Sequence, residues 1–543
     1  MKVPSVVLLE WRLYKRAERY SLGLNYIHAA LKNSGFNTQT FLFEGVSIEK
    51  ACEDILAADP DIVGIKFYSE TSVPTFEIAR KLKEKKPQIK IAIGGHTATL
   101  YGALILKQEP SIDIVVSGEG ELTFIELCER IQNNQSLSDC QGIIYREGDT
   151  IFRNQPRGFI KDLDTAILPD SSVFEDSKDP SSWFVQYAIS TARGCTGNCY
   201  FCVINRVYEE KGKKQWRGMS PEKIVDELEQ ASLKFSNKQM IVKFVDSAFE
   251  DPDPKTKKRL RRIIQLIGER HLNIAFSFFT RAESWSSEDE DLIIEMKKAG
   301  LYKISLGLDE SIKPYAIRDF TRKALCQENK QVSKLFERNG VQPYGYLILF
   351  HPFITMENLE ESAIFLDEIG MSPYPDVWTH EVTLYPDTRL FSHVVSSGLL
   401  LGTDSEGYSY KYGYEDGRVT KMQAVIHEVK ELTSFRNIRS SMLKVDMDFD
   451  VYNAWSGRMQ EMQVIKDEMD TYKSKVLSLY KELGNRQREL FLEAVSIIKQ
   501  GRFNSNSWIV EAWDQVFSEK QGELEKMWLQ NRLQIGRKKV RLN

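Results

Sequence analysis

Short apolar runs alternate with amphipathic helical segments over much of this 543-residue chain. In the N-terminal part, five apolar runs each precede a segment of helical periodicity: residues 5–9, 38–44, 62–68, 89–95 and 112–116. Regular alternation of strands and helices predicts a parallel sheet covered on both faces, and strands that are apolar throughout suit burial on both sides. We therefore expect an α/β fold in which residues 1–140 form a doubly wound, Rossmann-like domain.

The alternation returns between residues 184 and 404. Six apolar runs there are expected to be strands: residues 185–191, 240–246, 274–280, 302–308, 344–350 and 377–385. Six consecutive strand-helix units predict a partial (β/α)6 barrel that is open on one side. In such barrels the catalytic groups lie at the C-terminal ends of the strands.

Two further segments have a different character. Residues 141–183 begin with an expected hairpin, with Gly148 and Asp149 at its turn, and continue as a Pro- and Asp-rich stretch that we interpret as a linker. From residue 405 to residue 543, apolar residues recur at helical spacing between charges, which predicts a C-terminal helical domain. A chain of this length needs more than one core.

Composition argues against several classes of protein. The 73 basic and 77 acidic side chains leave a net charge of −4, so no field attracts a polyanion and nucleic acid is not an expected partner. No run of eighteen apolar residues occurs, so we expect no membrane span. The apolar N-terminal stretch runs directly into charged residues, unlike a secretion signal. We therefore expect a cytoplasmic protein.

Three of the seven cysteines, Cys195, Cys199 and Cys202, lie within eight residues of one another. Thiolates are soft ligands, and these short gaps let one loop hold three corners of a [4Fe-4S] cluster. Three ligands would leave one iron open to a substrate. A zinc ion completed by a distant residue, or three unrelated thiols, is also compatible with the spacing.

This CxxxCxxC loop resembles the signature of the radical S-adenosylmethionine (SAM) superfamily, where it likewise follows the first barrel strand. Later segments resemble that superfamily in the same order: residues 216–230, 242–251, 279–311, 344–362 and 383–400. The resemblance implies that SAM binds the open iron and is cleaved to a 5'-deoxyadenosyl radical, which abstracts hydrogen from substrate. It also implies an electron donor such as flavodoxin or ferredoxin.

The same resemblance suggests contacts to SAM beyond the three iron ligands. Phe201, between the last two cysteines, would pack near the adenine, and Asp246 would contact the amino group at the end of the second strand. Arg281, at the end of the third strand, could pair with the SAM carboxylate, and Glu310 is expected to contact SAM after the fourth strand. Ordinary packing, for Phe201, or surface salt bridges, for the other three, are the alternatives.

Residues 1–140 resemble the cobalamin-binding domain that precedes many radical SAM cores. The matching pieces are residues 20–31, 62–71, 91–99 and 117–121. They imply cobalamin contacts from the following residues at strand ends: Ser69, Gly94, Gly95, His96, Ser117, Gly118, Glu119 and Gly120. The DxHxxG motif, which supplies a histidine ligand to cobalt in other cobalamin proteins, is absent, as it is in many radical SAM members. A retained fold without the cofactor is the alternative.

Three functions are compatible with these patterns. If cobalamin binds, the resemblance implies a methyltransferase that acts on a natural product or a peptide. If it does not, the layout is similar to that of radical SAM peptide epimerases, with Cys326 returning hydrogen to the substrate radical. The third is a non-catalytic scaffold with a vestigial cysteine triad. The expected substrate is a small molecule or a peptide.

Overall fold

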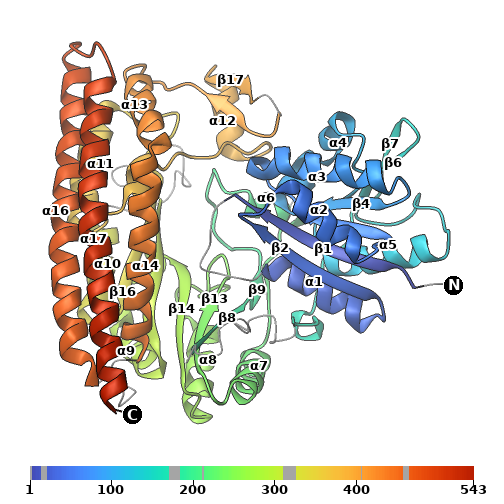
Figure 1. Ribbon diagram of the computed structural model, residues 1–543, viewed down its shortest axis with the longest axis horizontal. Helices are drawn as coiled ribbons and strands as arrows, with labels where there is room; N and C mark the ends of the chain where they lie inside the picture. The colour runs from blue at the N-terminus through green and yellow to red at the C-terminus, as the bar shows by residue number, and fades with distance from the viewer. Residues whose placement is uncertain are drawn as a thin grey trace. The chain divides into compact units, whose positions relative to one another are not determined.

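The structure is a computed structural model that describes residues 3–13, 21–169, 184–210, 213–309, 326–404, 407–455 and 464–542 (Figure 1). The chain divides into two compact units. The first comprises Met1–Thr196, Val203–Met240 and Thr403–Ser409, and the second comprises Gly197–Cys202, Ile241–Gly402 and Tyr410–Asn543.

A seven-stranded sheet of order β2-β1-β3-β4-β5-β6-β7 organises the first unit (Figure 1). Its strands are β1 (Ser5–Arg12), β2 (Asn37–Glu44), β3 (Ile62–Lys66), β4 (Lys90–Gly94), β5 (Ile114–Val116), β6 (Ile143–Glu147) and β7 (Thr150–Arg153). The first five strands in this order, β2, β1, β3, β4 and β5, all run parallel. This strand order reverses between β1 and β3, as in doubly wound folds, and confirms the Rossmann-like prediction.

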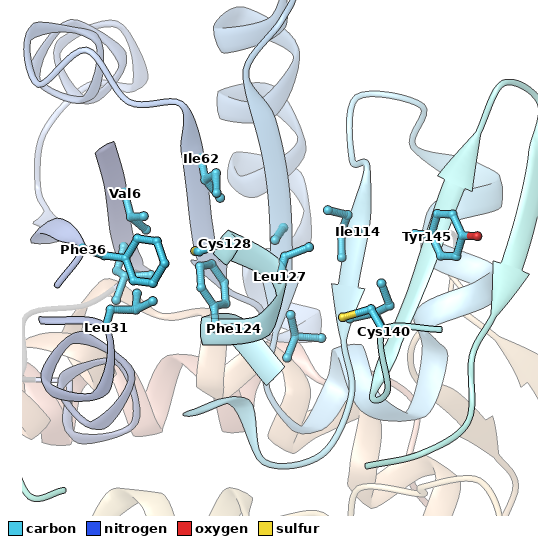
Figure 2. Packing of buried hydrophobic residues seen from close by; sticks show 14 of the residues in the cluster. Val6, Leu31, Phe36, Ile62, Ile114, Phe124, Leu127, Cys128, Cys140 and Tyr145 are labelled. Atoms are coloured by element: carbon cyan, nitrogen blue, oxygen red, sulfur yellow. The ribbon is translucent and has the colours of Figure 1, made fainter. Parts of the chain in front are cut away.

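Both faces of this sheet are buried. The helices of the unit are α1 (Leu22–Asn33), α2 (Ile48–Ala57), α3 (Ser72–Lys85), α4 (His96–Gln108) and α5 (Gly120–Gln132). Successive residues of β1, Val6 to Leu9, are all fully buried although their side chains alternate between the two faces. Figure 2 shows the core on one face, where Leu31 of α1 and Phe124 of α5 pack with Val6 and Ile62.

The predicted hairpin is present and extends the first sheet. β6 pairs antiparallel with β5 and with β7, and Gly148 has a φ of 57° between the two hairpin strands. A positive φ at this turn favours glycine. The sequence had suggested a hairpin beside a linker; its apolar strand β6 is instead buried against β5, which adds two strands to the edge of the Rossmann-like sheet.

A second sheet has the order β16-β15-β14-β13-β8. Its strands are β8 (Phe184–Ile189), β13 (Gln239–Phe244), β14 (Ile274–Arg281), β15 (Leu301–Asp309) and β16 (Gln342–Leu347). β14, β15 and β16 run parallel. The sixth predicted strand is wrong in detail. Pro375 opens a 3-10 helix, Pro375–Thr379, and two isolated bridges follow it, from Glu381 to Phe350 and from Leu384 to Tyr410.

Helices cover one face of β14, β15 and β16. They are α8 (Lys258–Glu269), α9 (Glu290–Ala299), α10 (Cys326–Arg338) and α11 (Met356–Glu368). On that face Ile304, Leu306 and Leu308 are buried, while the register places Ser277, Lys303 and Gln342 side by side on the other. This division of apolar and polar residues follows from the two-residue period of a strand.

The C-terminal region is helical, as predicted. Its helices are α13 (Val419–Glu431), α14 (Thr433–Trp455), α16 (Lys466–Lys499) and α17 (Ser507–Leu542). α14 contacts β14 and β15, and the buried Gln487 of α16 donates hydrogen bonds to the carbonyl oxygens of Ser372 and Pro373 at 2.9 and 2.8 Å. The helices therefore share a core with the second sheet.

The remaining described α-helices and strands are β9 (Ala192–Arg193), α6 (Ile204–Val207), β10 (Glu209–Glu210), β11 (Lys213–Lys214), β12 (Arg217–Gly218), α7 (Pro221–Lys234), α12 (Arg389–Ser396), β17 (Leu400–Thr403) and β18 (Tyr410–Tyr412). Among the described residues, no helix combines the length and the apolar character needed to cross a bilayer.

Candidate active site

The three clustered cysteines lie on the loop that follows β9. All three are half-buried and none forms a disulfide. The backbone N–H of Cys202 donates a hydrogen bond to the carbonyl oxygen of Cys199 at 3.3 Å, so residues 199–202 form a tight turn. Three soft donors on one short loop suit an iron-sulfur cluster.

The described residues contain no group of three or more His, Cys, Asp or Glu side chains that converge as the ligands of a single metal ion would. Cluster ligands are arranged differently. A zinc ion draws its ligands to within about 2.3 Å of one point, whereas each thiolate of a cubane binds its own iron. The assignment of Cys195, Cys199 and Cys202 as iron ligands therefore rests on the chemistry of their thiolates. This assignment stays a prediction.

The backbone at the start of this loop requires a glycine at position 194, directly before Cys195. Its φ is 85°, and a Cβ built there would lie 2.0 Å from the carbonyl oxygen of Gln215. The close approach arises because β9 pairs antiparallel with β12, with Arg193 opposite Arg217. Only glycine combines this φ with this spacing. The sequence analysis did not single out Gly194, although its place beside the first cysteine was a signal.

Phe201, between the second and third cysteines, packs against an apolar cluster. The buried members of the cluster are Val382, Leu384, Leu390 and Val394. The neighbouring Tyr200 carbonyl accepts a hydrogen bond from the N–H of Leu390 at 3.1 Å, and the Arg389 guanidinium lies 5.1 Å from the Tyr200 ring. The loop is thus anchored to residues 382–394. This geometry gives Phe201 a packing role, and its contact with adenine stays a prediction.

Two predicted SAM contacts are buried at strand ends. Asp246 follows β13 and is 4% exposed. Arg281 ends β14, and its guanidinium lies 2.7 Å from a carboxylate oxygen of Asp251 and 3.4 Å from one of Glu250. Burial raises the pKa of Glu250, although Arg281 opposes that shift. The structure engages Arg281 with carboxylates of the protein itself, so its pairing with the SAM carboxylate stays a prediction.

Two other candidates lie wholly or partly outside the described residues. Glu310 lies outside the described residues. Cys326 is the first residue of α10, and its side chain lies outside the described part of the structure. Its role as a hydrogen donor stays a prediction.

The predicted cobalamin contacts lie together at the carboxyl edge of the first sheet. Ser69 begins a 3-10 helix after β3, Gly94 ends β4, and Ser117 to Gly120 follow β5. Parallel pairing brings these strand ends to one edge. Gly95 has a φ of 109°, and its Cβ would lie 3.3 Å from the carbonyl oxygen of Phe67. Exposed backbone at this edge fits a bulky ligand.

Charged side chains at the same edge escaped the sequence analysis. Glu10 of β1 pairs in register with Lys66 of β3, and the Lys66 ammonium lies 3.0 Å from the Glu10 carboxylate. Arg12 lies 3.2 Å from the other Glu10 oxygen. These residues sit where the strand order reverses, which is the usual ligand position in doubly wound sheets. Desolvation, and then the nearby Lys66 charge, lower the pKa of His96.

Glu119 differs from its neighbours on the β5–α5 turn. Its carboxylate is 8% exposed and lies 3.1 Å from the Arg193 guanidinium and 2.7 Å from that of Arg217. Desolvation acts to raise the pKa of Glu119, but the two arginines lower it overall. The Glu119 carboxylate is thus bound by two arginines of the protein itself, and its contact with cobalamin stays a prediction.

A half-buried polar cluster joins α14 to the polar face of the second sheet. The Lys303 ammonium lies 3.0 Å from the Asp450 carboxylate, and the Tyr480 hydroxyl donates to Asp446 at 3.1 Å. Burial raises the pKa of Asp446 to about 7, while Lys303 opposes this shift. No sequence pattern reveals this cluster, because its members come from distant segments and carry no motif.

Asp446 is expected to make the protein less stable as the pH rises. Its folded-state pKa lies above the usual value, so the unfolded chain loses this proton first, and stability falls between about pH 4 and pH 7. The Asp446 carboxyl group is faced by four titratable groups: Lys303, Asp450, Tyr374 and Tyr480. The titration of each is coupled to that of Asp446. We expect the unfolding free energy of the wild type to fall by about 1 to 2 kcal/mol from pH 5 to pH 7 relative to Asp446→Asn.

Urea unfolding at several pH values measures this difference. Asp467→Asn, at an exposed position of α16, serves as the control and should track the wild type. Parallel curves for the wild type and Asp446→Asn would contradict the assignment of a protonated Asp446.

Two family models match the chain. One, described as the B12 binding domain, matches residues 17–128, and one, described as the radical SAM superfamily, matches residues 189–366. The chain is 26% identical over 368 residues to "Uncharacterized methyltransferase PH0819" of Pyrococcus horikoshii, a match that covers 68% of this chain and 76% of the relative.

Two further relatives differ in their stated activity. The chain is 28% identical over 347 residues to the anaerobic magnesium-protoporphyrin IX monomethyl ester cyclase of Rubrivivax gelatinosus, covering 62% of this chain and 60% of the cyclase. It is 23% identical over 413 residues to the cytidylyl-2-hydroxyethylphosphonate methyltransferase of Streptomyces wedmorensis, covering 65% and 74%.

Two solved structures are similar in fold. The cobalamin-dependent SAM radical enzyme OxsB, with aqua-cobalamin and SAM bound, superposes with a TM-score of 0.69 at 16% identity and covers 98% of this chain and 81% of OxsB. The radical SAM methyltransferase TsrM from Kitasatospora setae, with cobalamin and a [4Fe-4S] cluster bound, gives a TM-score of 0.58 at 14% identity and covers 76% and 84%. These likenesses confirm the fold.

Proposed function

We propose that this chain is a cobalamin-dependent radical SAM methyltransferase, because the family models of the B12 binding domain and of the radical SAM superfamily both match it. It is a radical SAM enzyme whose cofactors are a [4Fe-4S] cluster, SAM and cobalamin. The observation that carries methyl transfer is the presence of both parts in one chain: a three-cysteine loop, and a doubly wound domain with its glycine turns at the carboxyl edge.

The residues of this chain have distinct tasks in that reaction. Cys195, Cys199 and Cys202 would hold the cluster, and the backbone at Gly95 and Gly118 would approach the corrin. When bound, the cluster and SAM supply a 5'-deoxyadenosyl radical, and cobalamin supplies a methyl group. The protein must keep the reacting centre dry and oriented.

Aromatic side chains on the polar face of the second sheet support an organic substrate. Phe279 and Tyr344 lie on that face, and the Tyr346 ring contacts both of them edge-on, with ring centroids 5.9 and 5.1 Å away. Tyr346 is 46% exposed near the C-terminal end of β16. Exposed aromatic rings at a strand end offer a stacking surface. We propose that a natural product or a peptide binds there.

A reductant must deliver one electron to the cluster, and we propose a small donor such as flavodoxin or ferredoxin. Three reduced thiols on a partly exposed loop suit a reducing compartment. We therefore place the protein in the cytoplasm.

Reconstitution tests the proposed function. The full chain is loaded anaerobically with iron, sulfide and hydroxocobalamin, desalted, and assayed for iron and cobalt. It is then incubated with SAM and dithionite. We expect about four irons and about one cobalt per chain, with both S-adenosylhomocysteine, from methyl transfer, and 5'-deoxyadenosine, from radical formation.

Each other outcome supports a different function. 5'-Deoxyadenosine without retained cobalt would overturn methyl transfer and favour the epimerase reading, for which Cys326→Ala would then stop hydrogen return but not SAM cleavage. Neither product and no bound iron would favour a non-catalytic scaffold.

A further inference from the structure

The turn between β5 and α5 is bonded to the segment that leads into the cysteine loop. Arg193, two residues before Cys195, lies 3.1 Å from the Glu119 carboxylate and 2.5 Å from that of Glu121. All of these residues belong to the first compact unit. The B12-binding domain and the first iron ligand are therefore connected through three side chains.

These ion pairs are largely shielded from solvent. The side chains of Arg193, Glu119 and Glu121 are only 12%, 8% and 13% exposed. Charges removed from water need a fixed partner, because an unpaired buried charge is strongly unfavourable. The positions of the two guanidinium nitrogens are accordingly tied to the positions of the two carboxylates.

Glu119 also binds the partner strand of Arg193. Arg217 of β12 is the register partner of Arg193 and lies 2.7 Å from the same Glu119 oxygen. The other Glu119 oxygen accepts a hydrogen bond from the N–H of Ile160 at 2.9 Å, and the Ile160 carbonyl accepts one from Arg217 at 2.5 Å. One carboxylate thus bridges both strands of a pair that is only two residues long.

Aromatic rings restrict the two guanidinium groups from the side. Arg193 lies 5.5 Å from the centroid of Tyr26, and Arg217 lies 4.7 Å from that of Phe159. Such contacts favour a particular position of the cation. The side chains of Arg193 and Arg217 therefore have few alternative conformations.

The backbone between Arg193 and Cys195 has little freedom to adjust if Arg193 moves. Gly194, the residue between them, packs against the carbonyl oxygen of Gln215 at a φ of 85°. A shift of Arg193 would be transmitted through this constrained residue to Cys195.

We propose that Glu119 is a positioning residue for Cys195, which it controls through Arg193 and Arg217. The turn at the carboxyl edge of the B12-binding domain would thereby set the geometry of the iron-sulfur loop. The proposal rests on the proposed function insofar as Cys195 is an iron ligand.

Glu119→Gln tests this in the full chain loaded with iron, sulfide and hydroxocobalamin. Glutamine keeps the shape of the side chain but removes the charge that two arginines share. We expect cobalt and iron to be retained, the change that SAM produces in the EPR spectrum of the reduced cluster to weaken, and 5'-deoxyadenosine formation per cluster to fall about 10- to 100-fold, as for a misplaced reacting group.

Two further variants sharpen the test. Glu49→Gln removes an exposed carboxylate that pairs with Lys81 in the same domain, and should match the wild type in every readout. Arg193→Lys keeps the charge but loses the forked geometry, and should reproduce the altered EPR spectrum. If Glu119→Gln does not fold, Glu121→Gln, which leaves Glu119 bound to both arginines, provides the same readouts with a smaller expected effect.

Three outcomes would overturn the proposal. A lower unfolding midpoint with unchanged EPR spectrum and SAM cleavage per cluster would show a merely structural role. Loss of cobalt with a normal cluster would place Glu119 at the cobalamin edge instead. An EPR spectrum of Arg193→Lys that matches the wild type would show that Glu119 does not act on Cys195 through Arg193. Failure of the proposed function is distinguishable, because it would show in the wild type as missing cobalt or missing SAM products.

Discussion

Cys199→Ala is expected to abolish cluster assembly and to reduce SAM cleavage to background, a loss of about three orders of magnitude or more. The two remaining thiolates would leave a second iron without a protein ligand, and a cubane held at two corners is readily lost. Cys199 also begins the tight turn that ends at Cys202. The visible absorption of the cluster, the iron content and the yield of 5'-deoxyadenosine measure the effect.

Cys52→Ala is the matched control for this prediction. Cys52 is buried in α2, far in sequence from the loop, and burial raises its pKa to about 11, so it is a protonated thiol. This variant should keep a full cluster. Both variants should retain cobalamin, since neither changes the carboxyl edge of the first sheet. A stoichiometric cluster with normal SAM cleavage in Cys199→Ala would show that this residue is not an iron ligand.

Gly194→Ala should destabilise the first unit by about 2 to 6 kcal/mol and lower the iron content sharply. A non-glycine residue in the left-handed region costs about 1 to 3 kcal/mol, and overpacking costs about 1 to 3 kcal/mol more. Here the added methyl would meet the carbonyl oxygen of Gln215 at 2.0 Å, so β9 and β12 must separate. Urea unfolding and iron analysis measure the two effects.

Gly522→Ala is a control of opposite sign. Gly522 lies within α17, and a Cβ there would meet nothing within 4 Å. Alanine in a helix interior is more favourable than glycine by about 0.5 to 1 kcal/mol, so this variant should be slightly more stable. Equal stability and iron content in Gly194→Ala and the wild type would mean that the loop tolerates a different backbone path.

Local patterns were sufficient to predict the elements of both sheets. The buried run Val6 to Leu9 is β1, and the turn at Gly148 joins β6 to β7 as expected. These features depend on a few consecutive residues, whose periodicity and turn chemistry act independently of the rest of the chain. The prediction was wrong for residues 377–385, because Pro375 directs the backbone into a 3-10 helix, after which the segment forms isolated bridges at Glu381 and Leu384 rather than a strand.

The partners of charged residues could not be predicted in the same way. Arg281 and Glu119 were both singled out as cofactor contacts from their places at strand ends. In the structure, Arg281 binds Asp251 and Glu250, and Glu119 binds Arg193 and Arg217. A long polar side chain pairs with whichever opposite charge the packing brings within reach, and that charge is often remote in sequence.

The amino-acid sequence by itself determined the two strand-helix alternations, the C-terminal helices and the three-cysteine loop, because each depends on spacing between near neighbours. Only the tertiary structure decided that the hairpin joins the first sheet and that α14 brings Asp446 and Asp450 to Lys303. It also decided that Glu119 pairs with Arg193, two residues before Cys195. Such contacts join distant segments, and buried charges acquire their partners only when those segments pack together.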